Sequence, residues 1–267
     1  MEEILRRGVT LAAPLVFKKI VQASLKRFGF QLVRIGSAEA QRSPEDILRP
    51  IDEPFRGALL SMYRGEPQVG LDGQLHEVNR FNGISPQEGI WLYQLCRDSK
   101  PKATLEIGMC YGFSTLFFLA ALAKNGSGLH TSIDPNETSH WHGIALTKIK
   151  EIGLQGSLRL LEDTSSRAAV DLCREGCAFD LILIDGAHLY EYALADFTLF
   201  APLCSIGGHI ILDDTWMPSI RTAISFIRTN RRDFSEVRPV VPEFAVFRKI
   251  GEDRRDWDHF ARFEVAG

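Results

Sequence analysis

The sequence predicts an α/β protein built on a doubly wound, mostly parallel sheet, with a helical segment at its N-terminus. Short apolar runs without hydrophobic alternation recur from residue 103 onward, and a helical stretch separates each run from the next. Parallel strands that helices cover on both faces have this pattern, and right-handed crossovers connect them. The runs are Ala103–Ile107, Leu129–Ile133, Leu158–Leu161, Leu181–Ile184 and Ile210–Leu212. Ligands of such sheets bind beyond the carboxyl ends of the strands, so functional residues are expected directly after each run.

Two further signals delimit the predicted sheet. The motif S-P-x-E that begins at Ser85 is a capping box with proline at the first helical position, and it predicts a helix to about Cys96. Residues 234–250 form two apolar stretches around a proline, which predicts a closing antiparallel hairpin. We therefore expect an N-terminal helical and lid segment in residues 1–82 and a ligand-binding domain in residues 83–267.

The N-terminal segment has a charge pattern of its own. Residues 1–38 carry seven basic residues against two acidic ones, interleaved with leucine, valine, isoleucine and phenylalanine. Such a helix fits an anionic membrane surface, a second subunit, or ordinary packing on its own domain. Residues 39–82 are rich in proline and glycine, which predicts a linker or lid.

The composition restricts the class of ligand and the compartment. There are 31 basic and 34 acidic residues, so a formal charge of -3 gives no global attraction to nucleic acid, and a small-molecule substrate fits better. The five cysteines are odd in number, which suggests free thiols in a reducing compartment. No apolar stretch is long enough to span a bilayer, and the start lacks a secretory pattern, so we expect a cytoplasmic protein.

The first apolar run leads into a loop of the acidic-x-Gly-x-x-x-Gly form. It contains Glu106, Gly108 and Gly112, followed by Ser114 at the start of a helix. A dinucleotide fingerprint needs two more glycines at places that hold cysteine and phenylalanine here, so NAD is disfavoured. The loop instead resembles the first motif of S-adenosylmethionine enzymes. Ser114 is then a candidate ligand of the methionine carboxylate, or alternatively only a helix N-cap.

The second and third runs end in polar residues. Asp134 follows the second run, where a carboxylate is able to accept hydrogen bonds from a ribose diol, although Asp-Pro also begins many Asx turns. The third run ends in Glu162–Ser166, which suits an adenine edge or simply the cap of the next helix.

The strongest candidate site follows the fourth and fifth runs. Asp185 and His188 come after one, and Asp213 and Asp214 after the other. Three carboxylates at one edge of a sheet repel one another, which favours a cation, and oxygen ligands suit magnesium, manganese or calcium. The aspartates are alternatively helix caps without a metal. The unperturbed pKa of a histidine, about 6.5, is near the range useful to a general base, so His188 is the candidate base.

Four motifs in order, LEIGMCYGFS, SIDPNE, LILIDGAHLY and GGHIILDD, resemble the metal-dependent O-methyltransferases typified by catechol O-methyltransferase and the caffeoyl-CoA enzymes. The resemblance covers roughly residues 82–250 and is closer to the macrocin-type bacterial sugar O-methyltransferases. It implies a Rossmann-like sheet of about seven strands with a reversed last strand. It also implies S-adenosylmethionine as cofactor and a divalent metal, with Mg²⁺ expected.

The same resemblance assigns roles to individual residues. Those implied for the cofactor are Glu106, Gly108, Gly112 and Ser114 at the methionine end, Asp134 at the ribose and Ser165 at the adenine, and those implied for the metal are Asp185, Asp213 and Asp214. The catechol enzymes have lysine where this chain has His188, whereas the sugar enzymes have histidine, which favours a sugar or another aliphatic diol. The catechol enzymes also have asparagine at the position of Asp214.

The expected activity is transfer of a methyl group from S-adenosylmethionine to one hydroxyl of a small-molecule diol. In this hypothesis the metal lowers the pKa of the bound hydroxyl and His188 takes its proton. One alternative is a metal-independent methyltransferase in which His188 acts alone. Another is a non-catalytic, cofactor-binding scaffold whose N-terminal helix contacts a membrane or forms a homo-oligomer.

Overall fold

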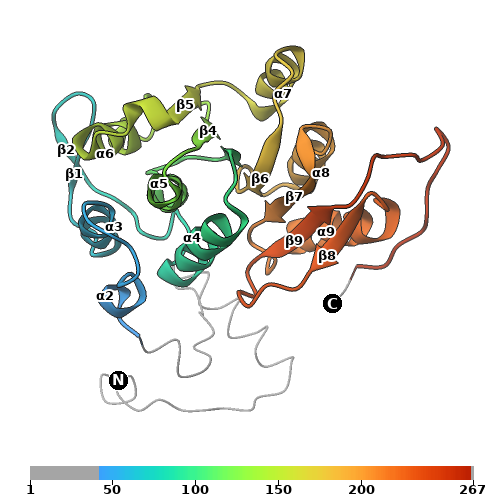
Figure 1. Ribbon diagram of the computed structural model, residues 1–267, viewed down its shortest axis with the longest axis horizontal. Coiled ribbons are helices and arrows are strands. Elements are labelled where there is room, and N and C mark those ends of the chain that lie inside the picture. The colour runs from blue at the N-terminus through green and yellow to red at the C-terminus, as the bar shows by residue number, and fades with distance from the viewer. Residues whose placement is uncertain (1–41, 266–267) are drawn as a thin grey trace, which may run out of the picture. The chain divides into compact units, whose positions relative to one another are not determined.

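The structure is a computed structural model that describes residues 42–265, and residues from Ser43 onward form one compact unit (Figure 1). Its central element is a seven-stranded sheet in the order β5-β4-β3-β6-β7-β9-β8. The strands are β3 (Ala103–Ile107), β4 (Leu129–Ile133), β5 (Leu158–Leu161), β6 (Phe179–Ile184), β7 (Cys204–Leu212), β8 (Phe234–Val237) and β9 (Ala245–Lys249). The first five are mutually parallel, and β9 runs antiparallel to both β7 and β8. The predicted α/β class and the C-terminal hairpin are confirmed.

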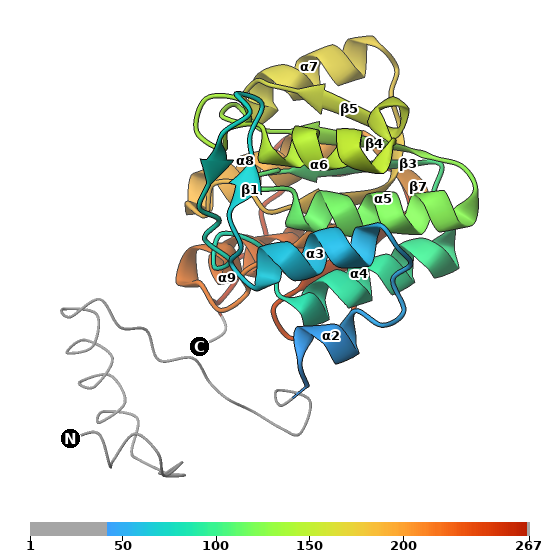
Figure 2. The same cartoon turned by 90° about the vertical axis from the view of Figure 1, so that its left-hand side faces the viewer.

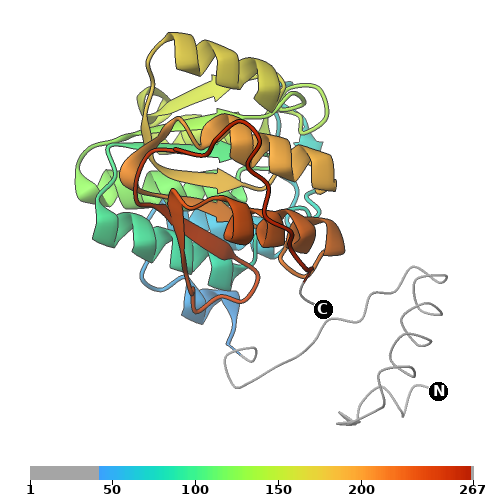
Figure 3. The same ribbon diagram turned by 90° about the vertical axis from the view of Figure 1, so that its right-hand side faces the viewer.

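Helices cover both faces of this sheet. One face carries α2 (Pro44–Ile47), α3 (Phe55–Tyr63), α4 (Pro86–Ser99), α5 (Phe113–Asn125) and α6 (Ile144–Ile152), all seen in Figure 2. The opposite face carries α7 (Ser165–Arg174), α8 (Tyr190–Phe200) and α9 (Pro218–Asn230), which face the viewer in Figure 3. A short 3-10 turn, Gln155–Ser157, precedes β5, and a two-stranded hairpin of β1 (Gln68–Val69) and β2 (Leu75–His76) lies outside the main sheet.

The two faces of β6 explain why its sequence is continuously apolar. Leu181 and Leu183 join the hydrophobic core shared with α3, α4 and α5, while Ile182 and Ile184 join the core shared with α7, α8 and α9. All of them are nearly inaccessible to solvent. Because successive side chains of a strand point to opposite faces, a strand between two helical layers has no polar face. A continuous apolar run is the result.

Several predicted boundaries hold, and the start of β7 does not. The capping box at Ser85 is present, with both of its reciprocal hydrogen bonds, and α4 begins after it. By contrast, β7 begins at Cys204, six residues before the apolar run that predicted it. Its first half contains Gly207 and Gly208, and its pairing with β6 changes register near Leu181. Glycine and an irregular register hide a strand from hydrophobic pattern analysis.

The segment expected to be a linker or lid contains two helices of the core. Leu48, Ile51, Leu59 and Met62 have no solvent-exposed surface and belong to the same hydrophobic cluster as α4 and α5. The expected basic N-terminal helix, residues 1–38, lies outside the described residues. Among residues 42–265, no helix is long and apolar enough to cross a membrane.

Close contact between α4 and α5 requires a glycine. A Cβ atom placed on Gly89 would lie 2.0 Å from the ring of Phe117, which is itself fully buried. We expect Gly89→Ala to lower the free energy of unfolding by about 1–3 kcal/mol through overpacking, although alanine is the better helix former. Urea denaturation measures this change. In Gly156→Ala, the matched control, the new Cβ has nothing within 4 Å, and equal losses in the two variants would contradict the packing argument.

Candidate active site

The carboxyl ends of four neighbouring strands meet at one edge of the sheet. Four backbone N–H groups each donate to the carbonyl oxygen of the last residue of an adjacent strand. The pairs, donor first, are Gly108 and Ile133, Asp134 and Leu161, Asp185 and Ile107, and Asp213 and Ile184. Each of these four residues therefore lies one position beyond its strand, on the same edge. The predicted convergence of the candidate residues at one edge of the sheet is confirmed.

The glycine loop after β3 is in direct contact with the acidic residues after β6. Gly108 has φ of 92°, and a Cβ atom at this position would lie only 2.1 Å from the carbonyl oxygen of Asp185. A left-handed backbone with no room for a side chain requires glycine. Gly112, with φ of 86°, is the N-cap of α5, and its missing Cβ makes room for Ala145. The loop thus turns into the N-terminus of α5 beside the acidic residues.

The side chain of Glu106, in β3, fixes the position of this loop through hydrogen bonds. Its carboxylate is fully buried and accepts hydrogen bonds from Ser114 (2.6 Å), from Ser132 (2.6 Å) and from Thr115. His130 Nε2 lies 3.1 Å from Glu106 Oε1, within ion-pair distance when the imidazole is protonated. Burial alone would raise the pKa of Glu106, but His130 and the hydroxyl groups outweigh it and hold the pKa below its ordinary value.

Asp134 and Ser165 also have protein partners. Asp134 Oδ2 accepts from the backbone N–H groups of Met109 (3.1 Å) and Cys110 (3.0 Å), and Oδ1 accepts from Asn136 (2.8 Å). The hydroxyl of Ser165, the first residue of α7, donates to Asp196 of α8 at 2.6 Å. Together with the Ser114–Glu106 hydrogen bond, these contacts give each polar side chain that was predicted to touch the cofactor a partner within the protein. Their direct contact with a ligand stays a prediction, while their role in shaping the loops is visible.

Asp185, His188 and Asp214 form the one group among residues 42–265 whose ligand atoms all lie within 4.8 Å of one another. His188 Nε2 is 2.7 Å from Asp214 Oδ2 and 3.3 Å from Asp185 Oδ1. Asp214 has φ of 57°, a left-handed conformation that aspartate tolerates better than most residues. The indole N–H of Trp216 donates to its other oxygen at 2.6 Å. His188 therefore bridges the acidic residues that follow β6 and β7.

The charges of this group perturb one another. Hydrogen bonds to Asp185 and Asp214 raise the pKa of His188 to about 10. Burial raises the pKa of Asp185 to about 6, against the opposing effect of His188. Asp213 is more deeply buried, and its oxygen Oδ1 accepts only from the backbone N–H of Asp214, at 2.6 Å. Burial, followed by the charges of Asp185 and Glu88, raises the pKa of Asp213 well above the ordinary range.

Glu88 is a site residue that the sequence analysis did not identify as one. It is the capping-box glutamate of α4, and it is buried near the acidic residues. Burial raises its pKa to about 7, with further contributions from Glu243 and Asp185. In the sequence, the capping box already explains a glutamate at position 88, so no pattern marked Glu88 as part of the site. His140 and His142 lie before α6, where the His142 ring stacks on that of His76 with 3.8 Å between the ring centroids.

We predict that Glu106→Gln is strongly destabilising, because it leaves His130 and the surrounding hydroxyl groups without their buried carboxylate. Breaking such a buried pair costs about 3–5 kcal/mol. Since the folded-state pKa of Glu106 is lowered, its ionised form contributes stability fully above the unfolded value, about 4.3, and loses it as the pH falls through the folded value. Thermal unfolding across acidic to neutral pH should show the difference between wild type and variant shrinking only in acid.

The control for this prediction is Glu151→Gln, on the exposed side of α6, where Glu151 pairs with Lys148 at 3.0 Å. A surface pair of this kind is worth about 0–1 kcal/mol, so that variant should unfold close to wild type. A Glu106→Gln protein as stable as the Glu151→Gln protein would show that the buried carboxylate does not hold the loop.

Comparisons with known proteins agree with this arrangement. Residues 105–215 match a family described as a methyltransferase domain. The chain is 24% identical to the flavonoid 3',5'-methyltransferase of Vitis vinifera over 54% of its own length and 61% of that protein. It is 30% identical to the catechol O-methyltransferase of Niastella koreensis over 38% of this chain and 45% of that protein. The matched region thus spans about half the length of these relatives.

The fold has solved counterparts as well. The O-methyltransferase from Bacillus cereus, solved in complex with SAH, superimposes with a TM-score of 0.59 at 19% sequence identity, over 77% of this chain and 94% of that one. This likeness shows that the two chains share a fold. Residues 105–215 of this chain therefore match the model of a methyltransferase domain, and the chain shares the fold of solved O-methyltransferases.

Proposed function

We propose that this protein is an S-adenosylmethionine-dependent O-methyltransferase that methylates one hydroxyl of a small molecule bearing two adjacent hydroxyl groups, with the help of a divalent metal ion. The observation that carries the proposal is the contact between Gly108 and Asp185. It joins a glycine loop of the type used for S-adenosylmethionine to a cluster of carboxylates with one histidine. A methyl donor and an acceptor held by these two loops would meet at the same edge of the sheet.

The acidic cluster fits a divalent cation. Asp185, Asp213 and Asp214 follow the adjacent strands β6 and β7, and the raised pKa values of Asp185 and Asp213 express the cost of ionising carboxylates that are buried close together. A cation relieves this cost, and oxygen ligands suit magnesium better than zinc. In this proposal the three aspartates hold the ion. When bound, a divalent ion lowers the pKa of a hydroxyl group that it coordinates.

The remaining chemistry belongs to His188 and the loops. His188 accepts the proton of the acceptor hydroxyl, whose oxygen attacks the methyl carbon while the bond from that carbon to sulfur breaks. The products are a methyl ether and S-adenosylhomocysteine. Hydrogen bonds to Asp185 and Asp214 fix the imidazole in place, and they keep it protonated at neutral pH while both carboxylates are free. Once the carboxylates are engaged elsewhere, the pKa of His188 falls and the base form becomes available.

The acceptor class follows from the cluster and from the relatives. Two adjacent oxygens are able to chelate one cation, which orients the reacting hydroxyl. The named relatives act on flavonoids and catechols, whereas a histidine at position 188 is the feature that favours a sugar or another aliphatic diol. We therefore propose a vicinal diol and test both kinds of acceptor.

Removal of divalent metal is expected to abolish methyl transfer, and added magnesium should restore it. Asp185→Asn should weaken magnesium binding, measured by calorimetry, and reduce turnover of a catechol or a sugar diol in parallel, because one ligand charge is lost. Asp171→Asn is the matched control, since Asp171 lies on the exposed side of α7 beside Arg174. Full activity of an Asp185→Ala, Asp213→Ala double variant would instead establish a metal-independent enzyme.

His188→Ala should lower turnover by roughly 10²- to 10⁴-fold, the usual contribution of a general base, with little change in magnesium or cofactor affinity. In wild type, turnover should rise with pH as His188 loses its proton, because only the unprotonated imidazole accepts one. The variant should lack this rise. If His188→Ala abolishes magnesium binding in calorimetry, the histidine is a metal ligand and another group is the base.

A further inference from the structure

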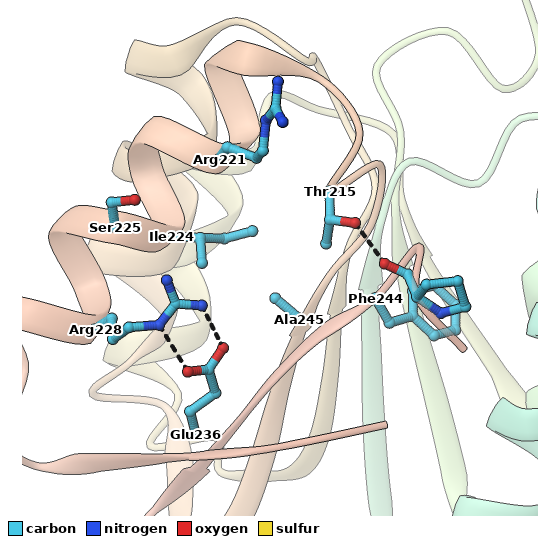
Figure 4. Close-up of a pocket in the computed structure, with 9 residues that line it drawn as sticks. Thr215, Arg221, Ile224, Ser225, Arg228, Glu236, Phe244 and Ala245 are labelled. Atoms are coloured by element: carbon cyan, nitrogen blue, oxygen red, sulfur yellow. Dashed lines mark hydrogen bonds and ion pairs between the residues drawn. The ribbon is translucent and has the colours of Figure 1, made fainter. Parts of the chain in front are cut away.

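A pocket of about 290 Å³ lies between α9 and the β8–β9 hairpin (Figure 4). Arg221, Ser225 and Arg228 line it from α9, and Phe244 lines it from the hairpin side. The pocket also reaches Thr215, the residue directly after Asp214 of the acidic cluster. Its volume approaches that of small-molecule sites, and part of its wall is apolar. It therefore suits an organic group rather than a lone ion.

Most polar groups of this pocket already have partners. Arg228 forms two hydrogen bonds with Glu236, at 2.7 and 2.6 Å, and the hydroxyl of Thr215 donates to the carbonyl of Pro242 at 2.6 Å. These contacts leave the Arg228–Glu236 pair neutral. The pair therefore adds no net charge to the pocket.

Two donors in the same pocket have no partner among the described residues. Arg221 Nε is buried without a hydrogen bond, and no carboxylate of residues 42–265 pairs with this guanidinium. The hydroxyl of Ser225 is also buried without a partner, and the residue is only 3% exposed. Buried polar groups in folded proteins are almost always paired, so two orphans in one pocket indicate a missing acceptor.

The positions of the two donors define what they would bind. Residues four apart on a helix lie on one face, one turn apart, so Arg221 and Ser225 are neighbours along the pocket wall. A guanidinium is a planar fork of N–H groups that matches a carboxylate, and the hydroxyl adds one further donor. Arg221 also lies near the N-terminus of α9, which favours negative charge. One unpaired positive charge suits a monoanion.

We propose that this pocket binds a carboxylate group of the methyl acceptor through Arg221 and Ser225, so that the acceptor is an acidic diol. The inference rests on the proposed function for the identity of the ligand as the acceptor. The link to the reacting centre is structural: Ser219 of α9 donates to the carbonyl of His188 at 2.6 Å. The helix that bears the two donors is thereby attached to the residue proposed as the base.

The test compares two probes, 3,4-dihydroxybenzoate and catechol, which differ only by the carboxylate. Binding is measured by calorimetry on the magnesium-loaded protein with S-adenosylhomocysteine, so the result does not depend on turnover. The acid should bind at least about tenfold more tightly than catechol, the lower end expected of a charge-assisted hydrogen bond. Arg221→Gln should abolish this preference without changing the affinity for catechol.

Ser225→Ala provides a variant that should not harm folding, because removing an unpaired buried hydroxyl costs little or is stabilising. It should keep or raise the melting temperature and yet reduce the preference for the acid several-fold. Arg174→Gln, which changes an exposed arginine of α7, is the charge control and should bind both probes as wild type does.

Equal affinity of wild type for the two probes, or a preference that survives in Arg221→Gln, would overturn the inference, as would undetectable binding of the acid. Tighter binding of phenyl phosphate than of benzoate would overturn the assignment to a carboxylate. Methyl transfer is assayed separately with the same two probes. An Arg221-dependent preference without any methyl transfer would count against the proposed function, while transfer to both probes without preference would count against the pocket alone.

Discussion

The buried carboxylate of Glu106 connects three parts of the molecule that the site depends on. It extends from β3, receives hydrogen bonds from Ser114 of α5 and Ser132 of β4, and lies beside His130 of β4. A buried charge is tolerated only when it is paired, so these contacts are required once the glutamate is present. They set the position of α5 relative to the sheet. The glycine loop between β3 and α5 is consequently held at both of its ends.

The glycine loop and the acidic cluster form one structure because their backbones touch. Gly108 lies against Asp185, and Asp134 accepts hydrogen bonds from the loop on its other side. Beyond this contact, burial and then the neighbouring like charges raise the pKa values of Asp185, Asp213 and Glu88. His188 partly compensates them as a cation. In the proposed function, a divalent cation offsets these charges beside the loop that binds the methyl donor.

Helix α9 relates this centre to the pocket beside it. Its first turn is bonded to the backbone of His188 through Ser219, and Arg221, two residues later, lines the pocket formed with the hairpin. The antiparallel hairpin is the part of the sheet that departs from the parallel pattern, and it supplies the opposite wall through Phe244. The hairpin edge of the sheet is therefore the place where the proposed acceptor carboxylate binds. Loops and edges at the carboxyl ends of strands commonly serve this purpose.

The sequence by itself determined the fold class, five strand positions, the hairpin and the residues that follow each strand, because buried parallel strands leave continuous apolar runs that local pattern analysis detects. It also determined that Asp185, His188, Asp213 and Asp214 lie at one edge of the sheet. Only the tertiary structure decided which side chains meet: His188 with Asp214, Ser165 with Asp196, and Glu88 with the acidic cluster. These partners are far apart in the chain and share no periodicity, so packing of separate elements, rather than any local propensity, brings them together.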